Sequence, residues 1–200
     1  MHHIRLIVVL AGLLAMTTAA FGAEAEGPMD YLQKVDKKLK PLLADAQKNE
    51  KRILKIVNNM MDFQSLCKKS LGRHWKDRTE DERKDFTETL HALIEQNVVK
   101  RLKDTKKHIV TYESEEIDGK DATVVTIVAS GKGPRAAQTE IVYKLKKKGP
   151  KWAVVDMVTD GVSLVQNYRS QFNKIITKDG WNVLMEKMTD KLKDAGKTGR

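Results

Sequence analysis

The hydrophobic positions in the first part of the chain recur every three or four residues, which is the period of an α-helix. One apolar stripe consists of Leu32, Val35, Leu39, Leu42, Leu43 and Ala46, and a second consists of Ile53, Ile56, Val57, Met60 and Met61. Pro41 falls inside the first stripe, so we expect it to kink that helix or split it in two. Asp62 can cap a further short helix, which Gly72 would end.

The strongest helix start is the sequence Thr79-Glu80-Asp81-Glu82. A threonine followed three residues later by a glutamate forms a capping box, in which each side chain accepts a hydrogen bond from the other residue's main chain. The helix that it opens carries one apolar face, consisting of Phe86, Leu90, Leu93, Ile94, Val98 and Leu102. Their spacing predicts a helix that runs to about residue 103.

The pattern then changes to alternation, in segments rich in Val, Ile, Thr and Tyr. Four strands are predicted, at 109–116, 121–130, 139–147 and 152–158, with Gly-containing turn signals at 118–119, 131–134 and 149–150. In the third strand Ile141, Tyr143 and Leu145 share one face, and charged residues occupy the other. Short turns and one wet face predict an antiparallel meander.

Helical spacing returns after Gly161. Two apolar stripes follow, the first of Leu164, Val165, Tyr168, Phe172, Ile175 and Ile176 and the second of Trp181, Leu184, Met185, Met188 and Leu192. The order of helices, strands and helices predicts an α+β fold, in which a four-stranded antiparallel meander is covered by helices from both ends of the chain.

The N-terminal segment between Arg5 and Gly22 is apolar and uncharged (LIVVLAGLLAMTTAAF), and small residues follow it before the first acidic residue. This is the layout of a secretory signal peptide, and the segment is shorter than the roughly 20 residues of a membrane-spanning helix. We therefore expect residues 1–23 to be cleaved and residues 24–200 to form one soluble domain in a compartment that is reached by export.

The chain is basic, with a formal net charge of +10, and loss of Arg5 with the signal peptide would leave +9. Such a charge would point first to nucleic acid in a cytoplasmic protein. An exported protein does not meet nucleic acid, so we expect no such partner. Anionic lipid headgroups and acidic proteins are the partners that the charge still favours, although solvated helix faces account for most of the lysines.

No arrangement of residues in the sequence predicts catalysis or metal binding. His74, His91 and His108 are not followed by a motif that would place a nucleophile. Together with Cys67 they match no common zinc spacing. We interpret Cys67, the single cysteine, as a small buried apolar residue rather than a reactive thiol.

Asp156 and Asp160 flank the end of the last strand. As an acid/base pair they would need burial and raised pKa values. The interpretation that we favour is that they cap the next helix or bond a nearby basic residue. The residues thus predict neither an enzyme nor a cofactor, but pattern alone does not distinguish a filled core from a hollow one.

The segment from Trp152 to Phe172 (WAVVDMVTDGVSLVQNYRSQF) resembles the MlaC family of periplasmic phospholipid-transport proteins, also called toluene-tolerance auxiliary proteins. A Trp-x-Val-x-Asp strand followed by a Gly-(Val/Ile)-Ser-Leu-x-Gln-Asn-Tyr-Arg-Ser-Gln-Phe helix is a specific pattern. Upstream, the sequence Leu-Gly-Arg-His-Trp at 71–75 resembles the family's segment before its long helix. The resemblance is weakest over 104–150, where the family does not account for the basic run at 144–148.

The resemblance implies that the sheet and helices enclose an apolar cavity for the acyl chains of a phospholipid, which is cargo rather than a cofactor. It implies a soluble carrier that shuttles between an outer-membrane lipoprotein–porin complex and an inner-membrane ABC transporter complex. Such a carrier maintains the lipid asymmetry of the outer membrane, and we expect it to be a monomer without enzymatic activity.

Candidate lining residues come from the apolar faces of the predicted elements, and some of them must be ordinary core. They are Phe86, Leu90, Leu93, Ile94, Val98, Val125, Ile127, Ile141, Tyr143, Val154, Leu164, Tyr168 and Phe172. Three other functions stay open at this stage: a carrier of another apolar lipid such as a hopanoid-type terpenoid, an enzyme that uses Asp156, and an interaction module with a filled core.

Overall fold

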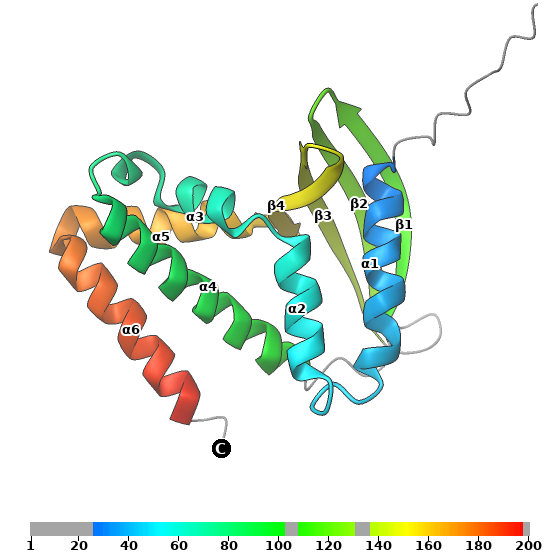
Figure 1. Ribbon diagram of the computed structural model, residues 1–200, viewed down its shortest axis with the longest axis horizontal. Coiled ribbons are helices and arrows are strands. Elements are labelled where there is room, and N and C mark those ends of the chain that lie inside the picture. Colours follow the sequence, from blue (N-terminus) through cyan, green and yellow to red (C-terminus); the bar gives the residue numbers. More distant parts are fainter. Residues whose placement is uncertain (1–25, 103–107, 131–136, 198–200) are drawn as a thin grey trace, which may run out of the picture.

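The structure, a computed structural model, describes residues 26–102, 108–130 and 137–197 (Figure 1). The signal peptide expected over residues 1–23 and the turn expected at 131–134 lie outside these ranges. Within them, no helix is both long and apolar enough to cross a bilayer.

The N-terminal third forms three helices, α1 (Pro28–Leu43), α2 (Glu50–Met60) and α3 (Phe63–Leu71), and the 3-10 turn η1 (Gly72–Trp75). The first apolar stripe does break after Pro41, since α1 ends two residues later and α2 begins at Glu50. The side-chain amide of Asn49 donates to the carbonyl oxygen of Leu42 at 3.2 Å. This bond satisfies one of the carbonyl groups that the end of α1 leaves without a helical partner.

Both predicted caps are confirmed. The Asp62 carboxylate accepts a hydrogen bond from the main-chain nitrogen of Ser65, which starts α3. Helix α4 (Glu80–Leu102) follows the capping box, in which the main-chain nitrogen of Thr79 donates to Glu82 at 2.8 Å and that of Glu82 donates to the Thr79 hydroxyl at 3.2 Å. These reciprocal bonds satisfy N–H groups that have no partner inside the helix.

The strands form one antiparallel sheet in the order β1-β2-β3-β4-β5. They are β1 (His108–Asp118), β2 (Asp121–Ser130), β3 (Ala137–Lys148), β4 (Lys151–Thr159) and β5 (Val162–Ser163). The predicted meander of four strands is confirmed, and three of those strands are one or two residues longer at each end than predicted. The fifth strand was missed because two residues are too few to show alternation.

The chain ends in α5 (Leu164–Asp179) and α6 (Trp181–Lys197). Figure 1 shows α1 lying in front of the sheet, alongside β1 and β2, while α4 and α6 run side by side and α5 extends from the sheet at an angle to them. Aromatic rings fill the space between these three helices: Phe86 meets Phe172 edge-on at 5.4 Å between ring centroids and Trp181 at 5.9 Å. The predicted α+β fold with helices from both ends of the chain is therefore confirmed.

The junction of α2 and α3 connects the helices to the sheet. Met61 forms a parallel bridge with Val154, and the main-chain nitrogen of Asp62 donates to the Val154 carbonyl at 2.8 Å. The buried Asp62 carboxylate also pairs with Lys148 at the end of β3. The helices and the sheet therefore share a single apolar core, with residues from α1 through α6 and from strands β2, β3 and β4.

Candidate functional site

Six of the thirteen predicted lining residues lie deep in the core. Each of them has at most 7% of its surface exposed: Phe86, Leu90, Leu93, Ile94, Val154 and Phe172. They belong to one continuous apolar cluster that joins α4 and α5 to β4. Because they pack against other side chains of this cluster, they are core residues whether or not they also contact a ligand.

Five further predicted residues are half-buried. Tyr143, Leu164 and Tyr168 pack against the core without being fully covered, and Val98 and Ile141 keep a similar exposure. They come from α4, β3 and α5. Apolar side chains that are partly covered at the edge of a core supply surface that an apolar ligand could cover.

Val125 and Ile127 do not join the other predicted residues. On β2 the buried residues are Ala122, Val124 and Thr126, so the residues between them point to the other face of the sheet. The register of the sheet agrees, because Val125 pairs with Val142 and Ile127 with Glu140, whereas Val124 pairs with Tyr143.

Two tyrosines mark the edge of the core beneath α1. Burial, with the nearby Asp36 carboxylate of α1 adding to it, raises the pKa of Tyr143 to about 12. The same two causes, with the neighbouring Tyr143, raise the pKa of Tyr112 further. Tyr112 was not predicted as a site residue, although it shares strand parity with Val110 and lies directly opposite the buried Thr126.

The residues considered for catalysis have structural partners. Asp156 is buried and accepts hydrogen bonds from the main-chain nitrogen of Val165 at 3.0 Å and from the Ser163 hydroxyl at 2.7 Å. These bonds hold the start of α5, as predicted for a capping residue. His91 bonds Asn58 at 3.0 Å and contacts the ring of Phe63.

Cys67 is fully buried, and burial raises the pKa of its thiol to about 12. Because the thiolate is the reactive form, the prediction of an inert thiol is in keeping with this pKa. Among the described residues, no group of three or more His, Cys, Asp and Glu side chains is placed to hold a metal ion.

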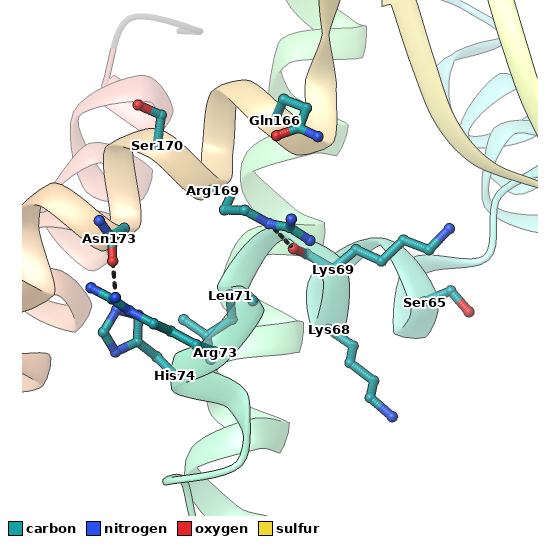
Figure 2. A pocket seen from close by; sticks show the side chains of 11 residues that line it. Ser65, Lys68, Lys69, Leu71, Arg73, His74, Gln166, Arg169, Ser170 and Asn173 are labelled. Carbon is teal, nitrogen blue, oxygen red and sulfur yellow. Dashed lines mark hydrogen bonds between the residues drawn. The ribbon is translucent and has the colours of Figure 1, made fainter.

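A groove of about 850 Å³ lies on the outer side of α3 and α5 (Figure 2). It is lined by Ser65, Lys68, Lys69, Leu71, Gly72, Arg73, His74, Gln166, Arg169, Ser170 and Asn173. None of these residues carries a carboxylate, so the groove is cationic. It contains none of the predicted apolar residues. No periodic pattern in the sequence predicts it, because its walls come from segments about 100 positions apart.

The family of the chain follows from a comparison with protein-family models. The model described as "MlaC protein" matches residues 29–190. The chain belongs to the MlaC family. The resemblance noted in the sequence is therefore confirmed, and it extends across α1 to α6.

Two relatives show how far the likeness to other MlaC proteins reaches. The chain is 27% identical to the intermembrane phospholipid transport system binding protein MlaC of Haemophilus influenzae, over 92% of this chain and 89% of that protein. Its fold matches the structure of a phospholipid-binding protein from Ralstonia solanacearum in complex with a phospholipid. That match has a TM-score of 0.73 and 18% identity, and it covers 87% of this chain and 99% of the other.

The residues that carry the resemblance to MlaC proteins hold the fold together. The indole nitrogen of Trp152 donates to the Glu26 carbonyl at 2.9 Å. The Arg169 guanidinium reaches from α5 to the Lys69 carbonyl, also at 2.9 Å. The motif therefore fixes the residues just before α1 to β4, and α3 to α5, which leaves the apolar side chains as the candidates for ligand contact.

Proposed function

We propose that this member of the MlaC family is a phospholipid carrier without enzymatic activity. The observation that carries the proposal is the family match over residues 29–190, which covers nearly all of the described chain. The name of the Haemophilus relative states phospholipid transport between membranes, and the Ralstonia structure was determined with a phospholipid.

The physical requirement for such a carrier is apolar surface. Burial of one methylene group is worth about 0.8 kcal/mol, so two acyl chains with roughly 30 methylene groups represent on the order of 20 kcal/mol gross. A lipid therefore does not cross water unaided at a useful rate. The carrier must offer comparable burial while it travels and must release the tails when it docks.

We infer that the tails lie against the helix-facing side of the sheet, where half-buried apolar side chains adjoin the core. The side chains concerned are Val98, Tyr112, Ile141, Tyr143, Met157, Leu164 and Tyr168. In this proposal the deeply buried residues, such as Phe86 and Leu90, support the site as core.

The proposal places the mature protein, residues 24–200, in the periplasm as a monomer that moves phospholipid between an outer-membrane lipoprotein–porin complex and an inner-membrane ABC transporter complex. Maintenance of outer-membrane lipid asymmetry would follow from that exchange. The signal peptide expected over residues 1–23 supports the location.

Native mass spectrometry tests the proposal. The protein is purified from the periplasm without added lipid, and its spectrum should contain an adduct with the mass of a two-chain phospholipid. Organic extraction of the same sample identifies the molecule. A polycyclic terpenoid in the extract would assign a different cargo, and a protein that stays free of any adduct in repeated preparations would be an interaction module with a filled core.

A further inference from the structure

The groove between α3, η1 and α5 carries charge that the fold does not neutralise. Four basic side chains line it: Lys68, Lys69, Arg73 and Arg169. Within the described residues, the side chains of the first three make no ion pair or hydrogen bond. By contrast, Lys34 and Lys187 on other helices do pair with carboxylates. The groove therefore presents several unpaired donors in one concave place.

Specific contacts fix the walls of this groove. The Arg169 side chain crosses from α5 to α3, where its Nε donates to the Lys69 carbonyl (Figure 2). Gly72 has a φ of +60°, and a Cβ atom there would lie 3.3 Å from that same Nε. His74 and Asn173 share a hydrogen bond of 3.0 Å on the far side. Because η1 is held against α5 at both points, the shape of the groove is built into the fold.

The groove is separate from the apolar interior. Its α5 residues, Gln166, Arg169, Ser170 and Asn173, recur at helical spacing and form one exposed or half-exposed stripe. Tyr168 and Phe172 lie on a different face of α5 and pack into the core. A ligand in the groove therefore does not occupy the position of the proposed lipid tails.

We propose that this groove binds a short acidic segment of a partner protein. The guanidinium groups of Arg73 and Arg169 have the planar geometry that matches carboxylates. Gln166 and Asn173 add amide groups that can bond a peptide main chain. From Gln166 to Asn173 the helix rises about 10 Å, which about three extended residues span. The concave shape suits a single chain better than the flat surface of a membrane.

The proposal goes beyond lipid carriage, since it does not depend on which cargo the protein holds. It is tested with a fluorescein-labelled synthetic peptide of about eight alternating glutamate and serine residues, a length that overhangs the groove at both ends. A peptide of alternating glutamine and serine is the uncharged control. Fluorescence anisotropy with the full mature protein should detect binding of the glutamate peptide only. The binding should weaken as NaCl rises from about 50 mM to about 300 mM, because screening shortens the reach of the charges.

Two triple variants with the same change in net charge distinguish binding at the groove from non-specific attraction of the peptide to a basic protein. The variant Lys68→Glu, Lys69→Glu, Arg73→Glu should bind the peptide about tenfold more weakly or worse. The control Lys37→Glu, Lys38→Glu, Lys40→Glu alters three exposed lysines of α1 and should change the affinity by less than about threefold. Circular dichroism checks the fold of both variants, and a glutamine version of the groove variant should give an intermediate loss.

Three results would overturn the proposal: equal weakening by both triple variants, no preference for the glutamate peptide, or saturation of the groove by inorganic phosphate or phosphatidylglycerol vesicles in place of the peptide. Native mass spectrometry of the groove variant distinguishes failure of this proposal from failure of the proposed lipid-carrier function. Its lipid adduct should be unchanged, because the altered side chains do not face the interior.

Discussion

Asp156 shows how a buried charge can serve the fold rather than chemistry. It is only 6% exposed, and its two oxygens accept from Met157, Ser163 and Val165. Asp156 and Asp160 are the two positions in the motif at which the sequence left a choice between an acid/base group and a cap. The occupied lone pairs support the cap, because a general acid or base needs an oxygen that can face a substrate.

Replacement of Asp156 by asparagine should therefore lower stability rather than abolish an activity. The amide offers one acceptor oxygen in place of two, so one buried donor loses its partner. We expect the free energy of unfolding to fall by about 1–3 kcal/mol in urea titrations. Asp160→Asn is the control, since Asp160 is exposed at a φ of 47° that asparagine also tolerates, and it should change stability by less than about 0.5 kcal/mol. Equal losses would contradict the capping role.

At the scale of elements, α4 owes its start to the capping box. Thr79→Ala removes the hydroxyl that accepts from the Glu82 main chain, and we expect a loss of about 1 kcal/mol in the free energy of unfolding. Thr177→Ala is the matched control: Thr177 is exposed inside α5, where alanine is the better helix former, so stability should rise by up to about 0.7 kcal/mol. If Thr79→Ala left the free energy of unfolding unchanged, packing alone would account for the position of α4.

The elements were predicted well wherever one physical signal dominated. The α4 stripe and the Thr79 box predicted a helix that starts where α4 starts and continues to Leu102, the last described residue before the gap. Alternation in β3 correctly placed Leu145 inside and Lys144 outside. In β2, however, apolar residues occupy both faces of the sheet, at Val124 and Val125 for example. Because apolar and polar residues do not alternate there, the sequence does not indicate which face of β2 meets the helices.

The candidate site was harder to predict than the fold. Periodicity identifies apolar faces but not how completely the neighbouring elements cover them, which depends on where α1 and α4 lie relative to the sheet. Tyr112 and Met157 were missed for this reason, although both flank the core. The cationic groove was not predicted from the sequence either, because Lys69 and Arg169 lie 100 positions apart in the chain and come together only in the folded protein.

At the scale of the whole molecule, one ion pair links the helices to the far end of β3. Burial by itself would raise the pKa of the Asp62 carboxyl, but hydrogen bonds from Lys148 and Ser65 outweigh it and hold that pKa below its ordinary value. A carboxylate with a lowered folded pKa contributes stability that is present above the unfolded pKa of about 3.9 and is lost as the pH falls through the folded pKa.

The native protein's free energy of unfolding should therefore exceed that of Asp62→Asn at neutral pH, and this difference should shrink as the pH falls below about 5. We expect it to be about 1 kcal/mol or less at neutral pH, because the Lys148 side chain is 51% exposed. Asparagine still caps a helix, so the variant should fold. Urea titrations across this pH range measure the difference, and a constant gap would show that the ion pair does not control it.

The two faces of the sheet offer a direct test of where lipid lies. Ile141 and Val125 are both half-buried and belong to neighbouring strands, but the register puts Ile141 on the side of Thr126 and Tyr143 and Val125 on the other. Ile141→Trp should fill space that the tails use and should reduce the lipid adduct in native mass spectra by at least half. Val125→Trp adds more bulk to the opposite face and should leave the adduct intact.

Either tryptophan could lower the free energy of unfolding by about 1–3 kcal/mol if it overpacks its surroundings. Thermal melts of both variants must therefore accompany the spectra. Loss of lipid from Val125→Trp alone would place the tails on the face away from α1.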